Sequence, residues 1–130
     1  APMRAELTTS GFTELKTSEE VVNKLEAMQG LTLVAVNSVC GCAAGSARPG
    51  ILQSLDNENT PNELYTVFAG QDLDAVTKAR EYMLPYPPSS PCIALFKDGT
   101  LVHFIERLHI EGRTAEMIAT NLRAAYNEFK

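Results

Sequence analysis

The sequence predicts an α/β protein in which a small mixed β-sheet is flanked by helices on both faces. Apolar runs at residues 31–36, 64–69 and 92–96 are separated by segments of helical periodicity along the 130-residue chain. This alternation predicts a β-α-β-α order whose first βαβ unit is parallel with a right-handed crossover. The Asp98-Gly99 pair then predicts a hairpin that adds antiparallel strands before a final helix.

Composition describes an ordinary globular protein and excludes several functions. The chain is 45% hydrophobic and 21% charged, with a net charge of −5 and scattered basic residues, which argues against nucleic-acid binding and against a polybasic membrane contact. No apolar run approaches the ~20 residues of a membrane span, and the N-terminus lacks the apolar core of a signal peptide. Three cysteines are too few for a disulfide scaffold. We therefore expect one domain over residues 1–130 and a cytoplasmic location.

The first third of the chain contains two predicted helices and one short strand. Residues 2–9 can form a helix with Pro2 in its first turn, and residues 12–15 alternate apolar and polar positions as an edge strand does. Residues 17–20 resemble a capping box. The helix that follows is expected to end at Gly30 and to bury Val21, Val22, Leu25 and Met28.

The rest of the chain continues the alternation. After the strand at 31–36 come the cysteine segment and a helix through 51–55, which Pro49 is expected to kink. A polar loop at 56–62, the strand at 64–69 and a helix over 73–83 precede the proline-rich stretch 85–91. Strands at 92–96 and 101–105 form the hairpin. The C-terminal helix is expected to bury Met117, Ile118, Leu122, Ala125, Tyr126 and Phe129.

Cys40 and Cys42 lie one residue apart where a buried strand is predicted to turn into a helix. Backbone N–H groups at a helix N-terminus favour an anion, so we expect the pKa of Cys40 to fall below that of a free thiol. Gly41 allows the backbone to bend enough for the two sulfurs to approach, although a bridge over so short a spacing is strained. Strained bridges are labile and oxidising, which favours redox chemistry.

Other interpretations of these residues remain open. Cys40, Cys42, Cys92 and a histidine could form a tetrahedral zinc site, although structural zinc pairs more often have a two-residue spacer. The pair could also be inert packing in an interaction domain. Arg48 could lower the pKa of the thiolate or lie on the helix surface. We expect His103 to be structural and Cys92 to pack in the core, and we expect no metal.

The element order, with a cysteine pair after the first long strand and Ser90-Pro91 before the hairpin, resembles thioredoxin. In detail the chain resembles the bacilliredoxin family, a thioredoxin-fold group with a Cys-Gly-Cys site. The matching stretches are 37–45, 47–50, 67–72, 88–91, 103–105 and 110–112. One departure from thioredoxin is Val34, which stands where thioredoxins have a buried acid.

The resemblance implies an oxidoreductase that acts on mixed disulfides between client proteins and bacillithiol or another low-molecular-weight thiol. Cys40 would be the attacking cysteine and Cys42 the second. Gly41, Ser90, Pro91 and Arg48 would contact the substrate, with Ser90-Pro91 in the place of the cis-proline loop. The small thiol would be a co-substrate, no cofactor would be tightly bound, and disulfide isomerase activity is permitted by the same chemistry.

Overall fold

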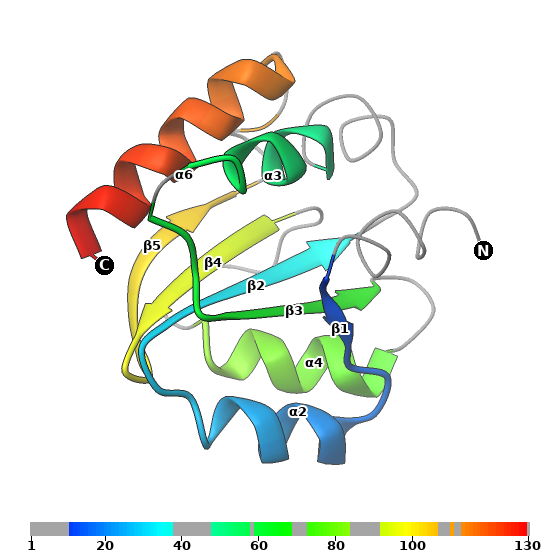
Figure 1. Cartoon of the computed structure of the whole chain (residues 1–130). Coiled ribbons are helices and arrows are strands. Elements are labelled where there is room, and N and C mark those ends of the chain that lie inside the picture. Colours follow the sequence, from blue (N-terminus) through cyan, green and yellow to red (C-terminus); the bar gives the residue numbers. More distant parts are fainter. Residues whose placement is uncertain are drawn as a thin grey trace.

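The computed structural model describes residues 11–37, 48–57, 59–68, 73–83, 92–106, 110 and 113–129. Its five-stranded sheet has the order β1-β3-β2-β4-β5. Two helices cover each face of the sheet, α3 and α6 on one side and α2 and α4 on the other (Figure 1). The elements are β1 (Thr13–Glu14), α2 (Ser18–Leu25), β2 (Leu31–Asn37), α3 (Arg48–Ser54), β3 (Glu63–Phe68), α4 (Leu73–Glu81), β4 (Cys92–Lys97), β5 (Thr100–Ile105) and α6 (Ala115–Phe129).

Strand directions confirm the predicted mixed sheet. β1 and β2 both run parallel to β3, which lies between them, whereas β4 is antiparallel to β2 and β5 is antiparallel to β4. β1 is the short edge strand expected from residues 12–15. β2 therefore lies at the centre, with a parallel neighbour on one side and an antiparallel neighbour on the other.

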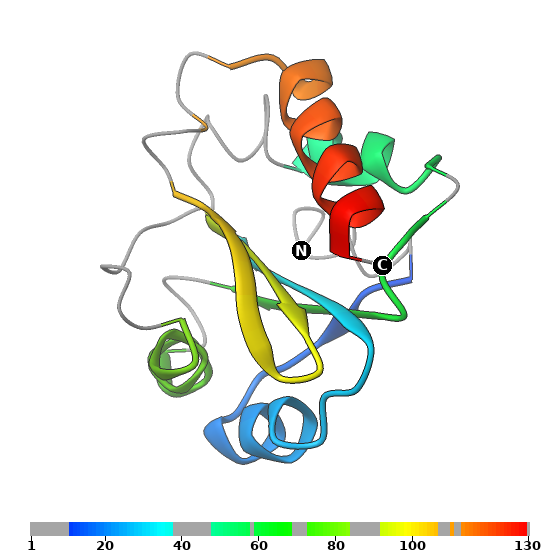
Figure 2. The same cartoon turned by 90° about the vertical axis from the view of Figure 1, so that its left-hand side faces the viewer.

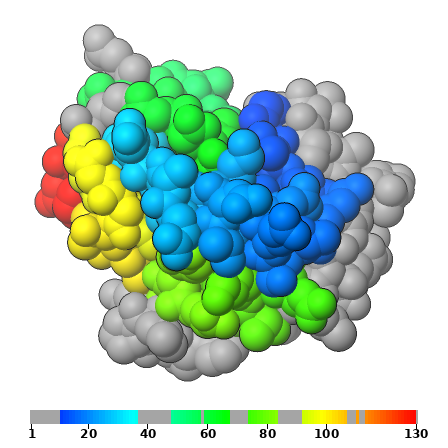
Figure 3. Space-filling model, turned by 90° about the horizontal axis from the view of Figure 1, so that it is seen from below, coloured from blue at the N-terminus to red at the C-terminus, as the bar shows by residue number. Residues whose placement is uncertain are grey.

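Alternating side chains of β2 and β4 divide the core into two clusters, because successive residues of a strand point to opposite faces. Leu31, Leu33 and Ala35 of β2 pack with α3 and α6, whereas Val34 and Val36 pack with α2 and α4. Figure 3 shows α2 and α4 side by side over the second face. The sheet is thus buried on both sides, as the continuous apolar runs indicated.

The capping box at the start of α2 is confirmed. Glu20 N donates to Thr17 Oγ1 over 3.1 Å, and Thr17 N donates to Glu20 Oε1 over 3.2 Å. The helix ends at Leu25, earlier than the expected stop at Gly30. Met28 lies in the core but outside the helix, because the chain must already turn there to enter β2. In the same way α4 ends at Glu81, before Met83.

The predicted hairpin turn is also confirmed. Asp98 and Gly99 have φ angles of 49° and 85°, the positive pair that a two-residue type I′ turn requires. Its position is tied to the start of β2, since Gly30 N donates to Asp98 Oδ1 over 2.7 Å and Asp98 N donates to Gly30 O over 2.9 Å. A register shift beside Leu95 and Phe96 interrupts the β4–β5 ladder.

One expectation for the C-terminal helix is wrong. α6 buries Ile118, Leu122, Ala125 and Tyr126 as predicted, but Met117 is 55% exposed. Met117 is next to Ile118 in sequence and therefore lies about 100° around the helix from it, at the border of the apolar stripe. The contact with α3 is made by Ile118, which lies against Gly50.

Two predictions concern residues that the structure does not describe: the helix over 2–9 and the effect of Pro49 on a helix that begins before Arg48. None of the helices in the described part of the chain combines the length and apolar character that a membrane crossing needs.

Two buried threonines form a matched test of polar burial. Thr32 Oγ1 has no hydrogen-bond partner within the described part of the chain, whereas Thr66 Oγ1 donates to Ala35 O over 3.0 Å. Valine has nearly the same shape as threonine. We expect Thr32→Val to raise the free energy of unfolding by about 1 kcal/mol and Thr66→Val to lower it by about 1 kcal/mol, measured by urea denaturation. Equal effects of the two changes would contradict this assignment.

Tyr126 predicts a loss of stability at alkaline pH. Burial raises the pKa of its phenol from 10.0 to about 12, and the hydrogen bond between Tyr126 and Ser54 opposes part of this shift. The unfolded chain loses the proton at lower pH than the folded chain, so this stabilisation is complete below pH ~10 and is lost as the pH rises towards ~12. We expect a loss on the order of 2–3 kcal/mol over this interval in the wild type but not in Tyr126→Phe. If the unfolding free energies of the wild type and Tyr126→Phe changed with pH in the same way, the assignment of this loss to Tyr126 would be contradicted.

Candidate functional site at the carboxyl edge of the sheet

Four strand ends meet at one edge of the sheet. Asn37 and Phe68, which end β2 and β3, are register partners, and Cys92 at the start of β4 is the partner of Val36. Ile105 at the end of β5 is the partner of Ile93. The chain segments that leave or enter these strands therefore begin beside one another.

The predicted cysteine pair and the Ser90-Pro91 segment connect directly to this edge. Cys40 follows the end of β2 by three residues, and Pro91 immediately precedes Cys92. Cys40, Gly41, Cys42, Ser90 and Pro91 themselves lie outside the described residues. The described strands thus fix where both segments start, and the roles of these five residues remain predictions.

Arg48 is the one predicted substrate-binding residue that the structure describes. It is 3% exposed at the start of α3 and interacts with other groups of the chain. The alternative that Arg48 is a surface residue is therefore wrong. Burial of a guanidinium costs free energy unless its N–H donors are satisfied, so the interactions of Arg48 hold its side chain in place. This fixed cation follows the cysteine segment closely in the sequence.

Close packing against α6 fixes the position of α3, and with it Arg48. A Cβ atom added to Gly50 would lie 2.7 Å from Ile118 Cβ, so only glycine permits this approach. Further along α3, Ser54 Oγ donates to Ile51 O over 2.6 Å and lies 2.9 Å from the Tyr126 hydroxyl, all in buried surroundings. The helix after the cysteine segment is therefore anchored to α6 at both of its ends.

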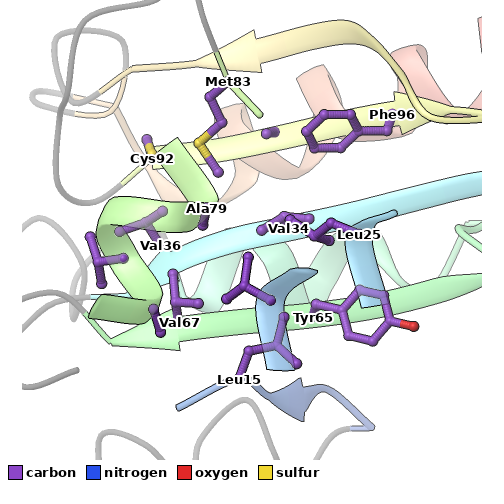
Figure 4. Close-up of a cluster of buried hydrophobic side chains, with 14 of the residues drawn as sticks. Leu15, Leu25, Val34, Val36, Tyr65, Val67, Ala79, Met83, Cys92 and Phe96 are labelled. Carbon is purple, nitrogen blue, oxygen red and sulfur yellow. The ribbon is translucent and has the colours of Figure 1, made fainter. Parts of the chain in front are cut away.

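Cys92 lies in the core, as the sequence predicted. Its side chain is 1% exposed and belongs to the cluster on the α2 and α4 face, together with Val36 and Met83 (Figure 4). α3 covers the opposite face of the sheet. The Cys92 thiol therefore lies on the other side of β4 from the helix that follows the cysteine pair.

The zinc hypothesis is untested, because two of its ligands, Cys40 and Cys42, lie outside the described residues. Within the described ranges no three His, Cys, Asp or Glu side chains gather closely enough to hold a metal ion. Val34, which stands where thioredoxins have a buried acid, is 0% exposed in the apolar cluster. This position of β2 therefore offers no proton acceptor.

His103 is a satisfied histidine, as expected, because its Nε2 lies 2.7 Å from Asn121 Oδ1 of α6. His109 lies outside the described residues. The pair forms part of a hollow between β5 and α6 that also contains Arg113 and Met117. The sequence pattern does not single out Arg113 or Asn121, because they are near His103 only through tertiary packing.

Comparison with known proteins agrees with this architecture. The sequence model of a family described as disulphide isomerase matches residues 1–130. A bacilliredoxin of Cytophaga hutchinsonii is 61% identical over 128 residues, which cover 98% of this chain and 94% of that protein. A bacilliredoxin of Halalkalibacterium halodurans is 56% identical over 127 residues, which cover 98% of this chain and 88% of that protein.

Solved thioredoxin structures have the same fold. Mitochondrial thioredoxin 3 of Saccharomyces cerevisiae in its oxidized form superposes with a TM-score of 0.58 at 17% identity, covering 92% of this chain and 96% of that one. Thioredoxin O2 of Arabidopsis thaliana in its oxidized state gives a TM-score of 0.58 at 20% identity, covering 91% and 96%. At these identities the likeness concerns the fold alone.

The burial of Cys92 predicts that its thiol is dispensable for disulfide exchange. We expect Cys92→Ala to retain the exchange rate of the wild type and to lose about 1 kcal/mol of stability, because a small buried side chain is removed from a close-packed cluster. Exchange kinetics and urea denaturation measure the two effects. A large loss of activity in a normally folded Cys92→Ala protein would instead include Cys92 in the redox chemistry, and loss of bound zinc would support the metal site.

Proposed function

The chain belongs to the bacilliredoxin family and is a thiol-disulfide oxidoreductase with a thioredoxin-like fold, and from this premise we propose that it removes a low-molecular-weight thiol from mixed disulfides on client proteins. The thiol is bacillithiol or a similar compound, and Cys40 is the attacking residue. Residues 1–130 act as one domain, in the cytoplasm, on S-thiolated proteins. The small thiol is a co-substrate, and no cofactor is tightly bound.

The arrangement of the strand ends is the main support for this proposal. Asn37 ends β2 three residues before Cys40, and Cys92, which directly follows Pro91, pairs with Val36 of β2. Two segments far apart in the sequence therefore start within one strand spacing, ~4.8 Å, of each other. An extended client segment at this edge can meet the nucleophile and the Ser90-Pro91 backbone at the same time.

The first step exchanges one disulfide for another. The Cys40 thiolate attacks the sulfur of the small thiol in the mixed disulfide, which forms a bond between Cys40 and the small thiol and releases the client cysteine as a thiolate. That thiolate takes a proton from water or from another group of the protein, because the buried Val34 position supplies no carboxyl group. No net oxidation or reduction has occurred at this stage.

Two routes regenerate Cys40. In the first, a second molecule of the small thiol attacks the adduct and leaves as the symmetrical disulfide. In the second, Cys42 attacks Cys40 Sγ, releases the small thiol and forms a Cys40–Cys42 bridge, which a dithiol reductant must then reduce. Gly41 permits this bridge, but the short spacing opposes it, so we favour the first route for most turnovers.

Arg48 has a supporting role in this proposal. Its buried cation at the start of α3 favours an anion in its surroundings, and so favours a thiolate on the preceding segment. Gly41, Ser90 and Pro91 contribute backbone groups to the docked disulfide. Exchange between two client disulfides is the second candidate function, favoured by the description of the matching family as disulphide isomerase.

Substitution of each cysteine separates the two roles. We expect Cys40→Ala to abolish release of the small thiol and to form no adduct, because the attacking thiolate is lost. Cys42→Ala should retain substantial release activity and should accumulate Cys40 bearing the small thiol. Intact-protein mass spectrometry after incubation with a bacillithiolated single-cysteine client measures both results.

Cys92→Ala serves as the control for loss of a cysteine outside the pair. An adduct on Cys42 in the wild type, or full activity of Cys40→Ala, would reverse the assignment of the two cysteines. If no small-thiol adduct forms while disulfides are still exchanged between two clients, isomerase activity is the function instead.

A further inference from the structure

We propose that the outward face of α6 is the interface through which two copies of this chain form an antiparallel homodimer. The inference concerns assembly and does not depend on the proposed reaction. Figure 2 shows α6, in orange and red, on the outside of the molecule with α3 beside it. The inner face of α6 packs on the core through Ile118, Leu122 and Ala125, so its opposite face is turned to solvent.

The centre of this outward face is an uncharged strip. Met117, Thr120, Ala124 and Asn127 are exposed and follow one another at intervals of three, four and three residues. This is the spacing by which one helix packs along another. Met117 is the one large apolar side chain that is exposed among the described residues, at 55%. One exposed methionine is ordinary on a protein surface, but in line with small uncharged side chains it forms a strip that a second helix can cover.

The charges beside the outward strip complement themselves when the second helix runs in the opposite direction. Glu116 and Arg123 are seven residues apart, close to two helical turns, so they lie on the same flank of α6 about 10 Å apart. In an antiparallel pair centred near Thr120, Glu116 of each copy lies opposite Arg123 of the other. A parallel pair in register would place each charge against its like. Charge complementarity therefore selects a reversed second copy of α6 as the occupant of this face.

Neither of these two charges is neutralised within one copy. Glu116 is exposed and Arg123 is half-buried, and within the described part of the chain neither forms an ion pair. Arg123 Nη2 donates to Gln53 O over 2.9 Å. This neutral acceptor holds the guanidinium on the flank of α6 and leaves its charge in place, and the charge is all that attraction across the interface requires.

The surface around Met117 has a shape that a second helix can fill. Thr114, Glu116, Met117 and Thr120 line a depression of about 410 Å³ on this face. When Glu116 lies opposite Arg123 of the second copy, Met117 lies between Thr120 and Ala124 of that copy. These short side chains allow the helix axes to approach to the ~8–10 Å of packed helices.

The fold holds α6 in place before association, which lowers the entropy that binding costs. Gly50 of α3 lies against Ile118, and the Ser54 and Tyr126 hydroxyls are 2.9 Å apart. Each copy contributes one helix of 15 residues, about 22 Å long. Such an interface is smaller than the standard size, so we expect a weak dimer with a dissociation constant on the order of 10–100 μM.

Sedimentation equilibrium of the full chain tests whether the dimer forms. All thiols are kept reduced, so that no disulfide links two copies. Between ~1 and ~500 μM we expect the average mass to rise from that of one copy towards that of two. Association should weaken at high salt, because salt screens exposed ion pairs. A single copy at every concentration would overturn the proposal.

Charge reversal tests the position and direction of the interface. Glu116→Arg and Arg123→Glu each replace two attractive pairs with two repulsive ones, so each variant alone should associate about tenfold more weakly than the wild type. An equimolar mixture of the two variants should recover association, because every arginine of the mixed dimer again faces a glutamate. If two folded variants associate as the wild type does, or if their mixture stays as single copies, the proposal is wrong.

Glu19→Arg is the matched control, because it makes the same change of charge on an exposed residue of α2, on the other face of the sheet. It should leave the dissociation constant unchanged. Equal weakening by Glu19→Arg and Glu116→Arg would attribute the effect to net charge and would overturn the interface.

Met117 provides a test that does not involve charge. Met117→Ala should weaken association about fivefold without loss of stability, because the side chain is exposed in the single copy. In the wild type, the ¹³C-methyl NMR signal of Met117 should shift with concentration over the range in which the dimer forms. Dimer formation with an unchanged Met117 signal would place the interface elsewhere and would overturn the proposal.

Discussion

Burial of β2 on both faces is the constraint on which the rest of the structure depends. Residues 31–36 are at most 1% exposed, so a one-residue slip would exchange the apolar sets of the two clusters. Side chains from other parts of the chain also fix its first residues, since Leu31 N donates to Asn62 Oδ1 over 3.0 Å and Gly30 N donates to Asp98 Oδ1 over 2.7 Å. Because the start and the register of β2 are fixed, the position of Asn37 at the carboxyl edge is fixed as well.

The two faces of the sheet contribute different residues near this edge. On one face, the contact of Gly50 with Ile118 and the pair formed by Ser54 and Tyr126 lock α3 onto α6, which holds the buried Arg48 at the start of α3. On the other face, α2 and α4 enclose an apolar cluster that contains Cys92. The thiol of Cys92, the first residue of β4, therefore lies on the other face of the sheet from α3, although β4 and β2 are neighbouring strands.

The cysteine motif and the hollow between β5 and α6 depend on the chain in different ways. The cysteine pair is a short sequence motif, and its chemistry depends on the strand before it and the helix after it. The hollow between β5 and α6 combines residues 103–105 with side chains from Arg113 to Asn121, brought together by the antiparallel hairpin and the packing of α6.

The sequence by itself determined the element order, the mixed sheet, the capping box at Thr17, the Asp98-Gly99 turn and the core position of Cys92, because these follow from local periodicity, backbone preference and apolar runs. The bacilliredoxin resemblance also came from the sequence, in six short stretches spread over most of the chain, of which the context of Cys40-Gly41-Cys42 is the most specific. Only the tertiary structure decided that Arg48 is buried, that Met117 is exposed and that Arg113 lies near Asn121 and His103. Helical periodicity gives the direction in which a side chain leaves the helix axis. Which part of the helix surface is buried depends on the element that packs against it.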